Sequence, residues 1–240
     1  MKILIISAMA DVELNYLIQC LNNKKEEEYC IGKFYLGNIQ DKDIILCESK
    51  VGLIKTASAL TFAIEKYKPD YIINQGCAGG FGYDVHKSDI VVATEIINIT
   101  SFMTKKRNRY EGSNLNNWEL INYLSGETDR LIPEKADINF INKINQIEKK
   151  YKEGKVHYGI IGSGDIWNKE IDRILYLNDK YNILCEDMEG ISVYTIANLY
   201  QIPAIDMRVI SNNEILNEEY DRNISINVQK FTLDLLKELN

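Results

Sequence analysis

Residues 186–190, Glu-Asp-Met-Glu-Gly, and residues 208–212, Arg-Val-Ile-Ser-Asn, decide how this chain is interpreted. Between them, an apolar segment of helix length (191–200) is followed by Gln-Ile-Pro and a second apolar run, which predicts a helix, a stop and a strand. The carboxylates therefore stand where a helix begins, and the polar groups of 208–212 stand where a strand ends. Because ligands bind at the carboxyl ends of strands in open α/β sheets, we expect the two clusters to face one pocket.

Buried strands and amphipathic helices alternate along the rest of the chain. Strands are predicted at 2–7, 33–38, 43–49, 71–74, 88–97 and 155–162, and helices after Asp11, after Gly52, at 137–150 and at 224–239. We expect Asp11 to cap the first helix and residues 76–80, Gly-Cys-Ala-Gly-Gly, to form a tight turn that a ligand can approach. This order predicts a three-layer α/β/α fold with a mostly parallel twisted sheet, in a single domain over 1–240.

The composition of the chain restricts the class of molecule that it is expected to bind. The formal net charge of -7 weighs against a nucleic-acid surface, which needs clustered Lys and Arg, and favours a small-molecule ligand. The five cysteines show no Cys-x-x-Cys spacing, and no apolar run reaches the length of a signal peptide or a membrane span. We therefore expect a cytoplasmic protein without disulfides, metal or organic cofactor. His86 and His157 have no accompanying serine nucleophile motif and are expected to be ordinary residues.

Together with the glycine segment and with residues 163–165, Ser-Gly-Asp, the motifs at 186–190 and 208–212 support a family assignment. In this order, over nearly the whole chain, they resemble the nucleosidase branch of the purine nucleoside phosphorylase superfamily. That branch contains the methylthioadenosine/S-adenosylhomocysteine nucleosidases and futalosine hydrolase-like relatives. The resemblance implies hydrolysis of the N-glycosidic bond of a purine nucleoside by a homodimer.

Breaking a ribosyl C–N bond requires a base for water, groups that hold the sugar hydroxyls, and stabilisation of the departing base. The resemblance implies that Glu13 activates water, that Glu189 and the Met188 backbone hold the ribose, and that Asn212 faces the purine. An aromatic ring at Trp167 would stack on the base. The resemblance also implies a binding role for Val51, Cys77, Ala78, Gly79, Phe102, Asn168, Asp187 and Arg208.

Two departures from the family pattern affect this interpretation. Counting without a gap places Val12 at the family's catalytic glutamate, so the choice of Glu13 needs a one-residue insertion after Met9, and Asp11 is the alternative. The family's aspartate is replaced by Asn212, and an amide cannot donate a proton as a carboxylic acid does. A nucleoside of a 6-oxopurine or a 7-deazapurine, which needs no protonation at N7, is therefore favoured, unless a neighbour such as Asp206 or Glu214 supplies the proton.

Other functions stay open at this point. A methylthioadenosine/S-adenosylhomocysteine nucleosidase is the first alternative, and a phosphorylase or a non-catalytic nucleoside-binding protein is the second. The segment 8–11 lacks the arginine with which related phosphorylases hold phosphate, which favours hydrolysis. The basic cluster of Lys105, Lys106, Arg107 and Arg109 indicates a solvated loop rather than an anion site. The surrounding segment 96–125 is where the resemblance implies a dimer interface.

Overall fold

The computed structural model describes residues 1–114, 117–121 and 134–239 of the chain. The first half contains β1 (Lys2–Ser7), a π-helix (Ala10–Leu14), α1 (Asn15–Cys20), β2 (Asn22–Tyr29), β3 (Gly32–Ile39), β4 (Lys42–Glu48), α2 (Leu53–Tyr67), β5 (Tyr71–Gly80), β6 (Ile90–Asn98) and β7 (Phe102–Met103). The second half contains β8 (Glu119–Leu120), β9 (Glu134–Lys135), α3 (Ile138–Ile147), a 3-10 turn (Glu148–Lys150), β10 (Val156–Ser163), α4 (Ile171–Tyr181), β11 (Ile183–Asp187), α5 (Gly190–Tyr200), β12 (Ala204–Asn212), a 3-10 turn (Arg222–Ile224) and α6 (Ser225–Glu238).

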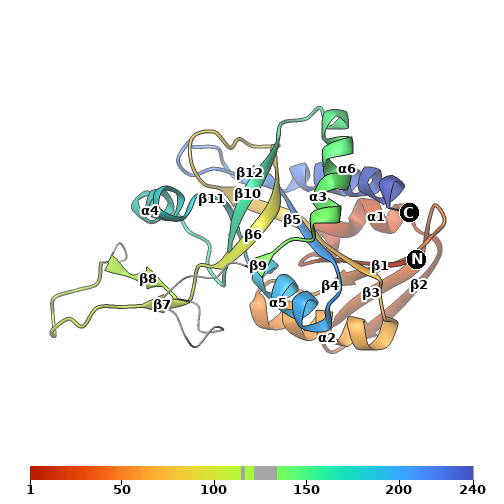
Figure 1. Ribbon diagram of the computed structural model, residues 1–240, viewed down its shortest axis with the longest axis horizontal. Coiled ribbons are helices and arrows are strands. Elements are labelled where there is room, and N and C mark those ends of the chain that lie inside the picture. Colours follow the sequence, from red (N-terminus) through yellow and green to blue (C-terminus); the bar gives the residue numbers. More distant parts are fainter. Residues whose placement is uncertain (115–116, 122–133, 240) are drawn as a thin grey trace.

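Helices cover both faces of one large sheet, which confirms the predicted three-layer α/β/α fold (Figure 1). α1, α3 and α6 pack against one face, and α2 and α5 pack against the other. α4 packs at the far end of the sheet, next to β10 and β11. β1 lies between β4 and β5, and its residues Ile3 to Ile6 are fully buried, which explains its uninterrupted apolar sequence.

The sheet is mixed and not purely parallel. Within the described residues its strand order is β11-β10-β6-β12-β5-β1-β4-β3-β2, with β9 paired to β6. The blocks β11-β10-β6 and β12-β5-β1-β4 are parallel, but β12 runs antiparallel to β6, and β3 runs antiparallel to both β4 and β2. β11 also pairs with β5, so the strands β5, β12, β6, β10 and β11 close on themselves.

Several elements differ from the sequence-based expectation. The glycine segment 76–80 is the end of β5 rather than a tight turn, because it pairs with β12 and then with β11. β2 was not predicted: it is a polar strand at the edge of the sheet that is exposed on both faces, so it carries no apolar alternation. α4 and β11 were also missed. Asp11 does not cap the first helix, because its carboxylate points outward and pairs with Arg222.

Outside the main sheet, β7 and β8 form a small hairpin that projects from the body of the protein (Figure 1). The basic residues 105–107 and 109 lie exposed in the loop between these strands, which agrees with a solvated loop. Within the described residues, no helix is long and apolar enough to cross a membrane.

Candidate active site

A pocket of about 300 Å³ lies where the strands β1, β5, β11 and β12 end. The motifs 186–190 and 208–212 meet there, as expected, because β5 pairs with both β11 and β12. The described lining residues are Ala8, Met9, Glu13, Val51, Cys77, Ala78, Gly79, Ile166, Trp167, Glu186, Asp187, Met188, Glu189, Ser211, Asn212 and Tyr220.

The π-helix after β1 directs Glu13 into this pocket. A π-helical turn holds one more residue than an α-helical turn, and such insertions occur often at functional sites. A π-helical turn at Ala10–Leu14 is compatible with the one-residue insertion after Met9 on which the choice of Glu13 rests. Glu13 is 3% exposed, whereas the Asp11 carboxylate is exposed and pairs with Arg222 at 2.8 Å. Of the two candidate carboxylates, only Glu13 lines the pocket.

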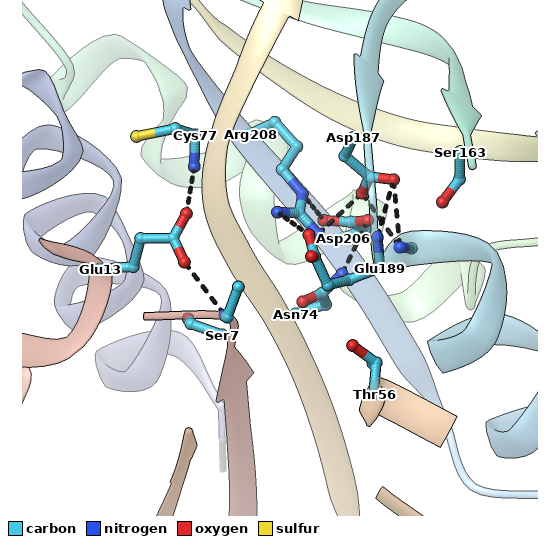
Figure 2. Close-up of polar contacts among 12 residues, drawn as sticks. Ser7, Glu13, Thr56, Asn74, Cys77, Ser163, Asp187, Glu189, Asp206 and Arg208 are labelled. Atoms are coloured by element: carbon cyan, nitrogen blue, oxygen red, sulfur yellow. Dashed lines mark hydrogen bonds and ion pairs between the residues drawn. The ribbon is translucent and has the colours of Figure 1, made fainter. Parts of the chain in front are cut away.

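Three backbone amides hold the Glu13 carboxylate. Oε2 accepts hydrogen bonds from the N–H groups of Ala8 (3.0 Å) and Met9 (3.2 Å). Oε1 accepts a hydrogen bond from the N–H of Cys77 at 2.9 Å (Figure 2). Burial raises the pKa of Glu13 above its ordinary value, although Arg208 and the three amides oppose that shift. The carboxylate is thus fixed in position and more basic than an exposed one.

Gly76 makes this arrangement possible. A Cβ at position 76 would collide with the Glu13 carboxylate and would lie 2.8 Å from Nη1 of Arg208. The missing side chain leaves the space into which these two charged groups extend. The glycine-rich sequence of β5 therefore serves the pocket rather than a turn.

Arg208 lies behind the pocket wall and binds three carboxylates, two of which line the pocket. Its Nε donates to Oδ1 of Asp206 at 2.8 Å, its Nη2 lies 2.7 Å from Oδ2 of Asp187, and its Nη1 lies 3.4 Å from Oε2 of Glu189 (Figure 2). All of these groups are buried. Asn74 donates a further hydrogen bond to Asp206 at 2.9 Å. Three carboxylates share one cation. Burial acts to lower the pKa of Arg208, but the surrounding carboxylates together outweigh it and raise the pKa, which keeps the guanidinium charged.

Glu189 stands at the start of α5, where its side chain enters the pocket. Its Oε1 accepts a hydrogen bond from the Gly52 amide at 3.1 Å. Burial raises the pKa of Glu189 to about 7, against the opposing effect of Arg208. A carboxylate with this pKa is a good hydrogen-bond acceptor for hydroxyl groups near neutral pH.

The opposite wall contains the groups expected to meet a base. Trp167 is half exposed and packs edge-to-face on Tyr220 at 5.6 Å. Behind it, the buried Asn168 donates hydrogen bonds to the Glu186 carboxylate from its backbone N–H (2.7 Å) and from its side-chain amide. Burial raises the pKa of Glu186 to about 7, and the hydrogen bonds from Asn168 oppose the shift.

Glu186 was missed as a separate functional residue, although it stands inside the motif 186–190. The signal that marks it is a carboxylate at the end of the otherwise apolar run 183–185, since burying a charge in such a strand is costly without a purpose. Ile166, Ser211 and Tyr220 are further lining residues that the sequence did not single out.

The structure places most of the expected residues in the pocket and a few elsewhere. Glu13, Val51, Cys77, Ala78, Gly79, Trp167, Asp187, Met188, Glu189 and Asn212 line it. Asn168 and Arg208 support it from behind, through Glu186 and Glu189. Phe102 is not a lining residue: it packs on Trp118 at 5.3 Å and under the Arg173 guanidinium, because the β7–β8 hairpin carries it away from the pocket.

The pocket is acidic. Four carboxylates line it, and none of its described lining residues is a lysine, arginine or histidine. Of the two neighbouring acids that could supply a proton, Asp206 is engaged with Arg208, and Glu214 lies beside Asn212. Within the described ranges, no group of three or more His, Cys, Asp or Glu side chains is arranged to hold a metal ion.

This fold and site define a nucleoside phosphorylase-like α/β protein, and comparison with known proteins agrees. The model of the phosphorylase superfamily matches residues 2–238. A 5′-methylthioadenosine/S-adenosylhomocysteine nucleosidase of Bacillus thuringiensis is 25% identical over 250 residues, covering all of both chains. The chain belongs to the phosphorylase superfamily.

Solved structures show the same fold. The 5′-methylthioadenosine/S-adenosylhomocysteine nucleosidase from Neisseria meningitidis, in complex with methylthio-immucillin-A, has a TM-score of 0.81 at 20% identity and covers 99% of both chains. The nucleosidase from Colwellia psychrerythraea, in complex with adenine, has a TM-score of 0.82 at 21% identity, over 100% of this chain and 96% of that one.

Proposed function

We propose that this protein hydrolyses the N-glycosidic bond of a purine ribonucleoside to the free base and the ribose moiety. The observation that carries the proposal is the position of Glu13: a buried carboxylate, fixed by three amides, in the same pocket as Glu189. The nucleosidases among the relatives support the same reaction class.

In this reaction Glu13 accepts a proton from the attacking water. The water oxygen forms a bond to C1′ while the C1′–N9 bond breaks, and the bonding electrons leave with the base. The raised pKa of Glu13 suits a general base near neutral pH. Its negative charge also stabilises the oxocarbenium-like centre that develops at the sugar.

The ribose is assigned to the wall formed by Met188 and Glu189. The Glu189 carboxylate accepts hydrogen bonds from the ribose hydroxyls, and Arg208 fixes its orientation from behind. Because Arg208 is held by Asp187 and Asp206 as well, it acts through Glu189 and is a positioning residue.

Hydrolysis is favoured over phosphorolysis by the charges of the pocket. A phosphate anion would meet four carboxylates, and none of the described lining residues offers a cation to bind it. Water is neutral and meets no such repulsion.

The base is proposed to be a 6-oxopurine or a 7-deazapurine with a 6-oxo group. Asn212 can donate a hydrogen bond to the 6-oxo group of such a base, which stabilises the charge that develops on departure. The second candidate is methylthioadenosine or S-adenosylhomocysteine, which the names of the relatives favour. An adenine leaving group needs a proton that the Asn212 amide cannot provide, so this second candidate requires another acid in the pocket, such as Glu186, whose pKa is raised to about 7.

Base release tests this function. We would incubate the protein with methylthioadenosine, inosine, guanosine and 7-deazaguanosine, with and without phosphate, and separate the products by chromatography. Hydrolysis predicts free base plus ribose in phosphate-free buffer. Formation of a ribose phosphate would indicate a phosphorylase, and the absence of any free base would indicate a binding protein.

We also propose that the protein works as a homodimer. Val51, Ile166, Trp167 and Tyr220 line the pocket and remain partly exposed, so its entrance offers apolar surface to a second copy. Phe102, on the projecting hairpin, is then available to a partner's pocket rather than to its own. Sedimentation velocity at micromolar concentration should give a dimer, and a monomer would contradict the proposal.

A further inference from the structure

Glu186 and Asn212 lie beside each other at the base end of the pocket. Glu186 lies near the end of β11 and pairs there with Gly79 of β5, while β12 places Asn212 opposite the same glycine. A Cβ built on Gly79 would lie 3.5 Å from Nδ2 of Asn212 and 3.6 Å from Cγ of Glu186. Both polar groups therefore border the same small area of the pocket wall.

Hydrogen bonds fix the orientation of the two groups. Nδ2 of Asn212 donates to the Glu214 carboxylate at 3.4 Å. Its Oδ1 accepts from the Ser211 hydroxyl at 3.0 Å, and that hydroxyl also lies 3.1 Å from the Ala78 carbonyl oxygen. The second hydrogen of Nδ2 is left for a ligand. Asn168 donates to each oxygen of Glu186, and each oxygen keeps a lone pair for another donor.

The wall thus presents an amide donor next to a carboxylate that accepts two hydrogen bonds. A 2-amino-6-oxopurine has the complementary pattern of hydrogen-bonding groups along its edge, since the 6-oxo acceptor is followed by the N1–H and 2-NH2 donors. Hypoxanthine lacks the second donor. Adenine presents an unprotonated N1 that would face the carboxylate lone pairs.

We propose that Glu186 and Asn212 together select a 2-amino-6-oxopurine, the edge shared by guanine and 7-deazaguanine, with Glu186 as the main specificity-determining residue. This inference rests on the proposed nucleosidase function and narrows its base. In a competing role, Glu186 would protonate the leaving base, and its raised pKa is compatible with that role as well. The two roles differ in what a substitution changes.

Base binding by calorimetry tests the selection without any catalytic step. The wild type should bind guanine and 7-deazaguanine more tightly than hypoxanthine, and hypoxanthine more tightly than adenine. Glu186→Gln keeps one hydrogen-bond acceptor and adds a donor. It should therefore lower the affinity for guanine about 10- to 100-fold, lower the affinity for hypoxanthine only a few-fold and raise the affinity for adenine. Glu65→Gln, on the exposed surface of α2, is the matched control and should leave all four affinities unchanged.

The outcomes separate this inference from the proposed function. Tighter binding of adenine than of guanine by the wild type overturns the inference, even if Glu186→Gln fails to fold. An equal loss of kcat by Glu186→Gln on every nucleoside, with base affinities unchanged, overturns it in favour of the proton-donor role. Guanine binding without hydrolysis of any nucleoside would remove the proposed function and leave the selection intact. Hydrolysis of methylthioadenosine together with preferential binding of adenine would support the proposed function and overturn the selection of a 2-amino-6-oxopurine.

Discussion

The two ends of the pocket are built differently. At the ribose end, Glu13 is held by three amides, and Glu189 is tied through Arg208 to Asp187 and Asp206, so each carboxylate is fixed by the backbone or by a buried ion-pair network. At the base end, Asn212, Glu186 and Asn168 make local hydrogen bonds, and Trp167 is half exposed.

This difference indicates which end can vary. A substitution in the Arg208 network leaves an unpaired buried charge, which threatens the fold as well as the reaction. A substitution at the base end changes one or two hydrogen bonds. The chemistry at the sugar is therefore built into the framework, whereas the choice of base depends on a few replaceable side chains.

Glu13→Gln should have the largest effect on activity. Removing the general base should lower kcat by roughly 10²- to 10⁴-fold, while the free base still binds, because the pocket keeps its shape. Steady-state kinetics and calorimetry check the two parts. Asp11→Asn is the control and should be fully active, since Asp11 is exposed and pairs only with Arg222. Loss of activity in the control with a fully active Glu13→Gln would mean that the water base is Asp11.

Arg208→Met should have the largest effect on stability. It leaves Asp187, Asp206 and Glu189 buried without their cation, which should lower the free energy of unfolding by about 3–5 kcal/mol. Urea denaturation measures the change. Arg222→Met, which breaks an exposed ion pair, should cost only about 0–1 kcal/mol. Similar losses for the two variants would show that the buried network does not support the fold.

The dependence of stability on pH should distinguish the carboxylates from ordinary ones. The pKa values of Glu186 and Glu189, about 7 in the folded protein against a usual 4.5, mean that the folded state holds protons that the unfolded chain has released. The free energy of unfolding should therefore fall as pH rises from 4.5 to 7. Glu186→Gln should reduce that fall by on the order of 2 kcal/mol, as urea titrations at about pH 5 and 8 would measure. An unchanged fall would contradict the raised pKa of Glu186.

Asn212→Asp should have the smallest effect and change mainly the choice of base. A carboxylic acid at this position can protonate N7 of adenine, so the ratio of kcat/KM for methylthioadenosine to that for guanosine should rise by about 10-fold or more. The free energy of unfolding, measured in urea, should change little. That result would show that the base end of the pocket, unlike the Arg208 network, can be altered without loss of stability. If the wild type already cleaves methylthioadenosine far faster than any 6-oxo nucleoside, the preferred base is adenine and the proposed preference for a 6-oxo base is wrong.

Patterns that depend on neighbouring residues in the chain were predictable. The buried strands β1, β4 and β12 appear in the sequence as apolar runs, and the helices α2, α5 and α6 have recognisable apolar faces and ends. The motifs 186–190 and 208–212 stand at a helix start and a strand end, which correctly indicated that they share a pocket. β2 and β11 were not recognised as strands. β2 is an exposed edge strand that needs no apolar alternation, and the apolar run of β11 is short, because two carboxylates follow it directly. Their pairing depends on partners far away in the sequence.

The layers of this protein, most of its helices and strands, and the residue types at the pocket follow from the amino-acid order alone, because hydrophobic periodicity and short motifs are local. Which carboxylate enters the pocket depends on how the chain folds. The π-helix turns Glu13 inward and leaves Asp11 outside, and a one-residue change in helical phase is invisible in the chain. The same holds for Glu186 and Asn212, which stand 26 positions apart and meet because β11 and β12 both pair with Gly79 of β5.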